Sequence, residues 1–266
     1  IGAARFAIQN TGDIYGIPIS AWVYPQDREK GFHDYALALP ITDWFINHVG
    51  PYPFSKLANV QSKTQFGGME NASNIFYTES SVNGNRTAEG LITHEIAHQW
   101  FGNSASEANW HHVWLSEGFA TYFTNLYMEQ KYGRDNFVER EKQQREEIIA
   151  FSKESRVPIV NTSIENYMNL LNTNSYQKGG WVLHMLRKEV GDEIFWKAIQ
   201  QYYDQYKLSN ALTEDLKNVF EQVSGKELDA FFNQWVMQAG QPEIDATWSY
   251  KDGNLNLQLE QKQKEN

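Results

Sequence analysis

Apolar and polar positions alternate at both ends of the chain and follow a helical spacing between them. Alternation over residues 1–25 and in two short runs, 56–61 and 74–79, predicts strands, and it returns after residue 243. Apolar residues three and four positions apart predict helices elsewhere. These helices are expected near residues 42–49, 88–101, 114–131, 135–151, 175–190, 192–206, 213–223 and 227–239. The pattern therefore predicts an α+β fold.

Breaks at glycine and proline divide this pattern into parts. We expect residues 1–25 to be the tail of a preceding β domain or a linker, and residues 243–266 to begin a following β domain. Residues 26–242 are expected to form one domain with two halves. The half over 26–134 is a small mixed α/β subdomain, and the half over 135–242 is mainly helical. The cleft between two such halves is the expected place for a site.

Composition narrows the classes of function. The chain has 266 residues and a net charge of −10, with no basic stripe, which argues against a nucleic-acid partner. It has no cysteine, so disulfides and cysteine-ligated zinc are excluded. No apolar run approaches the ~20 residues of a membrane span, and the compartment stays open. Because the chain does not begin with Met, we expect it to be a piece of a longer protein.

The candidate chemistry lies in His94-Glu95-Ile96-Ala97-His98 and in Glu117. Two histidines four apart on a helix share one face, so both imidazoles can reach one ion. Eighteen residues separate His98 from Glu117, enough for a turn and a second helix that returns a carboxylate to the same ion. Three protein ligands leave a fourth position for water, as a catalytic zinc site requires. Glu95 lies beside them and can act as general base on a zinc-bound water.

Four motifs stand in one order along the chain: Gly67-Gly68-Met69-Glu70-Asn71, the His-Glu-x-x-His segment, Glu117, and Tyr176-Gln177-Lys178-Gly179. Together they resemble the catalytic domain of the aminopeptidase N-like zinc peptidases, gluzincins of the family that also contains leukotriene hydrolase. The resemblance runs from about Trp22 to about Pro242. It implies a thermolysin-like fold, one Zn²⁺ ion, and peptide substrates with a free N-terminus. It also implies adjacent domains of the same longer chain as partners.

The resemblance assigns a role to each matching residue. His94, His98 and Glu117 are expected to hold the zinc. Glu95 and Tyr176 are the expected catalytic residues, Glu95 as general base and Tyr176 as donor to the oxyanion. Glu70 is expected to bind the free α-ammonium of the substrate. The full substrate-binding set that the resemblance implies is Gly67, Gly68, Met69, Glu70 and Asn71.

Some positions depart from the commoner family text. Gly68 stands where alanine is usual, and Thr124 stands where many members carry a glutamate seven residues after the zinc glutamate. His111-His112 replaces Asn-Asp; with His184, these histidines are expected to be structural rather than ligands. We also expect Thr87 to cap the zinc helix and Asn71 to be buried beside the site.

The leading hypothesis is a zinc aminopeptidase that releases N-terminal residues from peptides. A lipid epoxide hydrolase is one alternative, but Met168 and Leu171 occupy the positions where leukotriene hydrolase carries Asp and Tyr. A zinc endopeptidase is another, and Glu70 argues against it because a carboxylate closing the cleft favours a free amine. A metal-retaining, non-catalytic scaffold is the hypothesis from a different class.

Overall fold

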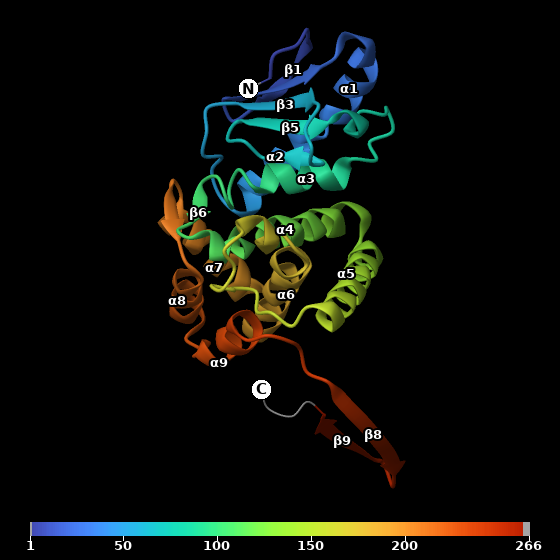
Figure 1. Ribbon diagram of the computed structural model, residues 1–266, viewed down its shortest axis with the longest axis vertical. Coiled ribbons are helices and arrows are strands. Elements are labelled where there is room, and N and C mark those ends of the chain that lie inside the picture. Colours follow the sequence, from blue (N-terminus) through green and yellow to red (C-terminus); the bar gives the residue numbers. More distant parts are fainter. Residues whose placement is uncertain (1, 263–266) are drawn as a thin grey trace.

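A computed structural model describes residues 2–262, and one five-stranded sheet forms its upper part in Figure 1. The strand order is β1-β2-β3-β5-β4, with parallel pairs β2–β3 and β3–β5 and antiparallel pairs at both edges. The strands are β1 (Ala7–Ile14), β2 (Ile17–Val23), β3 (Leu57–Ser62), β4 (Gly68–Met69) and β5 (Asn74–Thr78). Residues 7–23 therefore share a sheet with β3 and β5, and a preceding domain stays a prediction.

Three helices pack against the sheet: α1 (Arg28–Tyr35), α2 (Ala38–His48) and α3 (Glu89–Ala97). On β2, Ile19, Ala21 and Val23 are fully buried while their neighbours are more exposed, so this strand has one core face. Figure 1 shows α3 along the lower side of the sheet, next to the helical part of the molecule. This position lets α3 contact both parts.

Six helices build the lower part: α4 (Trp114–Tyr132), α5 (Arg134–Glu154), α6 (Gly179–Val190), α7 (Asp192–Tyr206), α8 (Thr213–Ser224) and α9 (Asp229–Phe232). Two short strands, β6 (Ala105–Glu107) and β7 (Ser209–Ala211), pair in parallel beside them. Every residue of α4 from Trp114 to Met128 is buried, so α4 is the central helix. Stacked rings of Phe45, Trp100 and Phe123 link α2, the turn after α3, and α4 in a single core.

The α+β prediction is confirmed, and the differences are local. The sequence pattern missed α1 because its segment, Arg-Glu-Lys-Gly-Phe-His-Asp-Tyr, has few apolar positions. The helix expected near 227–239 is the short α9 followed by a π-helical turn, Asn233–Met237. Thr87 does not cap α3, because Ala88 is the N-cap residue and Thr87 Oγ1 accepts a hydrogen bond from Asn83 instead, at 2.5 Å.

The last two described strands, β8 (Ile244–Lys251) and β9 (Asn254–Gln261), form a hairpin that projects away from the helices in Figure 1. All residues of both strands are exposed. Trp248 pairs with Leu257 and Tyr250 with Leu255, so one face of the hairpin is apolar. The expected following β domain stays a prediction.

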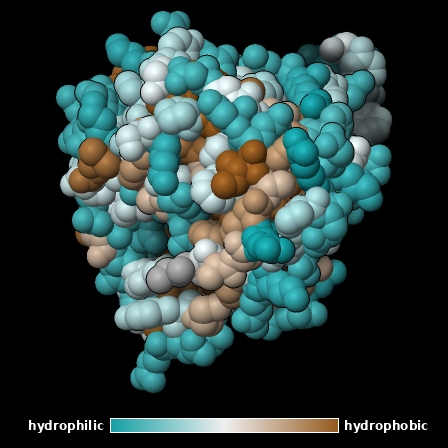
Figure 2. Space-filling model, turned by 90° about the horizontal axis from the view of Figure 1, so that it is seen from above, coloured by the Kyte–Doolittle hydropathy of each residue, from teal (hydrophilic) through white to brown (hydrophobic). Residues whose placement is uncertain are grey.

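Hydrophilic side chains cover most of the end that carries the sheet, and hydrophobic ones gather there in small patches (Figure 2). Among the residues that the structure describes, no helix combines the length and the apolar character needed to cross a bilayer.

Candidate active site

Helices α3 and α4 bring three predicted ligands to one point. His94 Nε2 lies 3.1 Å from His98 Nε2 and 3.2 Å from Glu117 Oε2, and His98 Nε2 lies 3.3 Å from the same carboxylate oxygen. The two histidines come from one turn at the end of α3, and Glu117 comes from the first turn of α4. Local helical periodicity explains the first pair, whereas packing of α3 on α4 supplies the third group.

These three atoms fit a metal ion. Ligands about 2.0–2.2 Å from a tetrahedral zinc would lie about 3.3 Å apart, close to the three distances above. His98 Nδ1 lies 3.1 Å from the carbonyl oxygen of Phe101 and 3.0 Å from Ser116 Oγ. The carbonyl can only accept, so it favours the tautomer with the proton on Nδ1 and directs the Nε2 lone pair to the ion.

The charges around this point favour a cation. Burial opposes a charge on His98, yet without a metal Glu117 outweighs burial and raises the pKa of His98 to about 10, so a bound cation would take the place of the proton on Nε2. Burial would also raise the pKa of Glu117, but His98 and His94 hold it well below its usual value. A buried carboxylate that stays ionised between two imidazoles is the environment that a bound divalent ion requires.

Glu95 lies beside the ligands with one oxygen unsatisfied. Its side chain is buried, and Oε2 has no hydrogen-bond partner within residues 2–262. Burial raises the pKa of Glu95 to about 7, against the lowering effect of His94 and His98. A Cβ atom at Gly68 would lie 2.2 Å from Glu95 Oε1. Glycine at this position, where the family usually has alanine, therefore leaves space for the Glu95 carboxylate.

Tyr176 reaches the same point from a π-helical turn, Asn174–Lys178, just before α6. Its hydroxyl donates a hydrogen bond to Glu117 Oε1 at 2.9 Å. Burial and then the Glu117 carboxylate raise the pKa of Tyr176, so the hydroxyl stays a donor at neutral pH. A Cβ at Gly118 would lie 2.9 Å from the backbone of Gly179, so two facing glycines allow the close approach of α4 and α6 that brings Tyr176 here.

Glu70 follows the edge strand β4 and is held through its backbone. Its carbonyl oxygen accepts hydrogen bonds from Gln99 Nε2 at 2.9 Å and Asn103 Nδ2 at 2.5 Å. Gln99 Oε1 also accepts from the backbone N–H of Ser73, at 2.8 Å. Residues just after the His-Glu-x-x-His segment therefore fix the loop that carries Glu70 relative to the metal ligands.

One cleft of about 540 Å³ contains these groups. Its lining from the predicted site comprises Gly67, Gly68, Met69, Glu70, His94, Glu95, His98, Glu117 and Tyr176. All predicted site residues except Asn71 thus line the same space.

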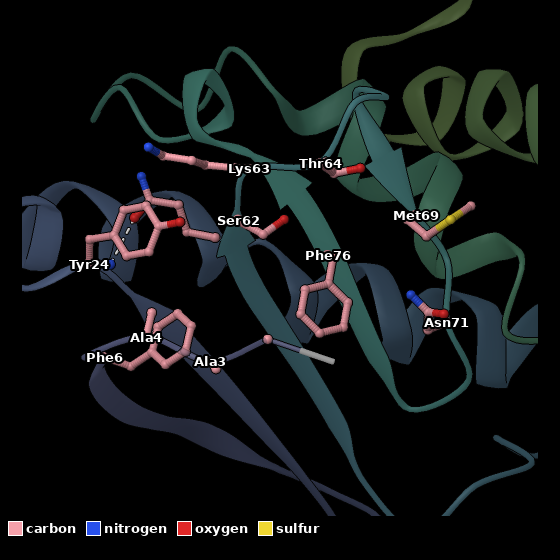
Figure 3. A pocket seen from close by; sticks show the side chains of 12 residues that line it. Ala3, Ala4, Phe6, Tyr24, Ser62, Lys63, Thr64, Met69, Asn71 and Phe76 are labelled. Carbon is pink, nitrogen blue, oxygen red and sulfur yellow. Dashed lines mark hydrogen bonds between the residues drawn. The ribbon is translucent and has the colours of Figure 1, made fainter.

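Asn71 lies in a neighbouring pocket of about 450 Å³, with Met69 and Phe76 beside it (Figure 3). The expectation that Asn71 is buried beside the site is wrong, because its side chain is exposed at this outer pocket. Met69 lines both spaces, since the two-residue strand β4 separates them.

Sequence reasoning missed several residues of the site. Gln99, Asn103 and Ser116 stand in the segments that flank the ligands, so their proximity in sequence was the available signal. Arg140 and Gln144 also line the cleft, and they come from α5, whose sequence carries no motif. The three histidines that were expected to be structural have partners outside the ligand group: His111 contacts the Ile164 carbonyl, His112 contacts Thr213 and His184 contacts Tyr122.

Comparison with known proteins agrees with this fold and site. The model of the peptidase family M1 domain matches residues 40–235, which is most of the chain. A fold of this kind, with a mixed sheet above a helical part and a largely buried His-His-Glu group between them, is that of a metallopeptidase catalytic domain. The chain belongs to peptidase family M1, as an aminopeptidase N-like catalytic domain.

Relatives from distant organisms share this region. Aminopeptidase M1-B of Oryza sativa subsp. japonica is 33% identical over 258 residues, 91% of this chain and 29% of the rice protein. Aminopeptidase M1 of Arabidopsis thaliana is 29% identical over 97% of this chain and 30% of the plant protein. Probable aminopeptidase 2 of Sulfurisphaera tokodaii is 31% identical over 73% of this chain and 26% of its own length. The chain thus matches less than a third of the length of these relatives.

Proposed function

We propose that this chain is the catalytic domain of a zinc-dependent aminopeptidase, excised from a longer protein. The observation that carries the proposal is the convergence of His94, His98 and Glu117 at distances that suit one metal ion. Glu95, with its unsatisfied oxygen, lies in the same cleft. The relatives are named aminopeptidases, which supports the same class of reaction.

In this proposal His94, His98 and Glu117 hold the zinc, which when bound acts as a Lewis acid on the scissile carbonyl and lowers the pKa of water. Glu95 takes a proton from the attacking water and later passes it to the leaving amine. A carboxylate whose pKa lies near 7 suits both halves of that transfer. The Tyr176 hydroxyl donates to the oxyanion of the tetrahedral intermediate, where charge develops.

Glu70 sets the direction in which a peptide substrate lies in the cleft. Its carboxylate lines the cleft, and no ion pair joins it to a cation in the described part of the chain, so it is free to bind the α-ammonium of a substrate. The backbone of β4, with Gly67 and Gly68, offers an edge on which an extended peptide can pair. An endopeptidase would need an open end here instead of an unpaired carboxylate.

An epoxide hydrolase of the same family is disfavoured by the lining of the cleft. Leu171 lies in the cleft and is apolar, and Met168 is about half exposed outside it. Neither side chain can supply the acid chemistry of an epoxide opening. The peptide-bond reaction uses only groups that line the cleft.

The test is hydrolysis of aminoacyl-anilides and their N-acetylated twins, with chelator and after zinc is restored. Free-amine substrates alone should be cleaved, with activity lost on chelation and recovered with zinc. The matched variant Glu95→Gln should keep zinc and lose turnover by about 10²–10⁴-fold. Equal cleavage of the acetylated twins would indicate an endopeptidase. Zinc binding without any cleavage would favour the scaffold hypothesis.

A further inference from the structure

One cation lines the candidate cleft, and no carboxylate of the described chain forms a direct ion pair with it, although the charge of the adjacent Glu141 acts on it. Among the residues of the described chain that line this cleft, Arg140 is the single lysine or arginine, and the acidic ones are Glu70, Glu95 and Glu117. Arg140 Nε donates a hydrogen bond to Asn125 Oδ1 at 2.7 Å. No ion pair to Arg140 occurs within residues 2–262. The guanidinium therefore keeps donors that can bind a ligand.

The nearest carboxylate in the sequence is directed elsewhere. Glu141 Oε1 accepts a hydrogen bond from Asn125 Nδ2 at 2.8 Å, and Asn125 Nδ2 also lies 3.0 Å from Gln144 Oε1. Asn125 thus bridges Arg140 to Glu141 and Gln144 without pairing the two charges directly. This network holds the Arg140 side chain in place, which lowers the entropy that a bound ligand would have to overcome.

The guanidinium lies beside Gly90, which is one helical turn before the first metal ligand. A Cβ atom at Gly90 would be 3.9 Å from Arg140 Nη2, and Gly90 stands one turn before His94 on α3. One turn spans about 5.4 Å along the helix. An extended peptide advances about 3.3 Å per residue, so this distance corresponds to the first or second residue beyond a scissile bond at the metal.

The position of Glu70 decides which side of the peptide this is. Glu70 shares a recess of about 350 Å³ with Val113 and Ser116, which precede Glu117. Thr121 and Thr124 follow Glu117 and line the cleft with Arg140. Glu70 therefore lies beside the segment that leads into α4, the metal ligand Glu117 comes next, and Arg140 lies beside the turn of α4 after it. A peptide anchored by its amine at Glu70 extends its leaving part toward Arg140.

We propose that Arg140 selects substrates with a carboxylate on the leaving side, one or two residues after the scissile bond. The carboxylate is either the C-terminus of a short peptide or an aspartate or glutamate side chain. The planar guanidinium can donate two parallel hydrogen bonds to one carboxylate. The other charged side chains of the cleft are three carboxylates, which repel an acidic substrate, so Arg140 is the side chain that attracts it. The inference rests on the proposed aminopeptidase function, because Glu70 sets the direction of the peptide.

The test uses matched pairs of free-amine tripeptides with leucine at the N-terminus. Leucyl-glycyl-glycine is compared with its C-terminal amide, and leucyl-glutamyl-glycine amide is compared with its glutaminyl twin. The first pair measures recognition of a terminal carboxylate, and the second measures recognition of a side chain. In the zinc-loaded protein, at least one acidic member should have a kcat/KM about tenfold above its neutral twin.

Arg140→Gln should remove this acid-to-neutral ratio, and Arg140→Lys should restore part of it. Arg145→Gln is the matched control, because it removes an exposed arginine of the same helix that lies outside the cleft. It should leave the ratio at the level of the unmodified protein. A change in the acid-to-neutral ratio reports recognition of the carboxylate. A general loss of folded protein lowers the apparent kcat/KM of both peptides of a pair by the same factor and leaves the ratio unchanged.

A binding measurement separates this inference from the proposed function. The affinities of the same pairs are measured by calorimetry on zinc-loaded Glu95→Gln, with and without Arg140→Gln. An acidic preference that disappears with Arg140 supports the inference even when no peptide is hydrolysed. Equal affinities within each pair, or a preference that survives Arg140→Gln, would overturn it while leaving aminopeptidase activity intact.

Discussion

At the scale of single residues, the two oxygens of the Glu117 carboxylate have different neighbours. Tyr176 donates to Glu117 Oε1, while Glu117 Oε2 faces both imidazoles. A ring of His94 lies nearly parallel to the Tyr176 ring, with centroids 6.0 Å apart. The tyrosine hydroxyl is therefore positioned at the edge of the metal site before any substrate arrives, as preorganised stabilisation of an oxyanion requires.

Tyr176→Phe should lower kcat by about 10²–10³-fold and leave ground-state binding nearly unchanged, since in the proposed mechanism the hydroxyl acts on charge that develops in the transition state. The measurement is kcat together with the affinity for a non-hydrolysed ligand. Tyr167→Phe is the control, because Tyr167 is exposed and lies outside the cleft. A loss of affinity equal to the loss of rate would contradict the transition-state role.

At the scale of elements, α4 controls the site through its contacts with α5 and α6. Gly118 faces Gly179 across the α4–α6 contact, and Asn125 on α4 bonds Glu141 on α5. The first contact sets the position of Tyr176 relative to the metal ligands. The second sets the position of α5 and, with it, of Arg140. Both depend on residues that carry no catalytic chemistry.

Gly118→Ala should separate α4 from α6, because the added Cβ would lie 2.9 Å from the Gly179 backbone. Overpacking of this kind costs about 1–3 kcal/mol of unfolding free energy, and kcat should fall as Tyr176 moves. Chemical denaturation and steady-state kinetics measure the two effects. Gly90→Ala is the stability control, since its Cβ would meet nothing closer than 3.9 Å. Unchanged stability of Gly118→Ala would refute the close contact.

The α4–α5 contact should make stability depend on pH. Burial raises the pKa of Glu141 to about 7 from a usual value of 4.5, so the folded state holds a proton that the unfolded state loses between these values. The contribution of Glu141 to unfolding free energy therefore falls as pH rises from about 4.5 to 7. Glu141→Gln keeps the acceptor for Asn125 and removes the charge.

We expect Glu141→Gln to match the unmodified protein near pH 4.5 and to gain up to about 3 kcal/mol at pH 8. Urea unfolding at the two pH values measures the difference. Glu139→Gln, an exposed change on the same helix, should give no such pH-dependent gain. A gain that is equal at both pH values would show that the Glu141 carboxyl is not the titrating group.

At the scale of the whole molecule, the candidate metal site joins the two parts of the fold. His94 and His98 come from α3, which packs against the sheet, and Glu117 comes from α4, the central helix of the lower part. An ion bound to all three would bind the folded chain and not the unfolded one. Its binding free energy would then add to the stability of the whole molecule.

Chelation should therefore lower the melting temperature. An ion at about 1,000 times its dissociation constant adds about 4 kcal/mol, which corresponds to about 10 °C for a chain of this size. Calorimetry of the zinc-loaded and chelated protein measures the shift. Glu95→Gln should show the same shift, and His98→Ala should show almost none. If the protein is shown to contain zinc and its melting temperature does not change on chelation, this linkage between metal binding and stability is contradicted.

The sequence by itself determined the elements and the local half of the site. Helical periodicity places His94, Glu95 and His98 on one turn, because residues four apart share a face whatever the rest of the fold does. The long amphipathic helices and the alternating strands were predicted for the same reason. Elements without a strong pattern, such as the charged α1 and the two-residue β4, were not.

Only the tertiary structure decided which distant residues meet the metal ligands. Glu117 was expected at the site from its spacing after His98, and Tyr176 from the family resemblance. Their distances, however, follow from the packing of α4 on α3 and α6. Arg140 entered the cleft without any motif, because helix packing and not spacing along the chain brings α5 there. Periodicity is a property of neighbouring residues, whereas a cleft is formed by surfaces that meet only after the core has packed.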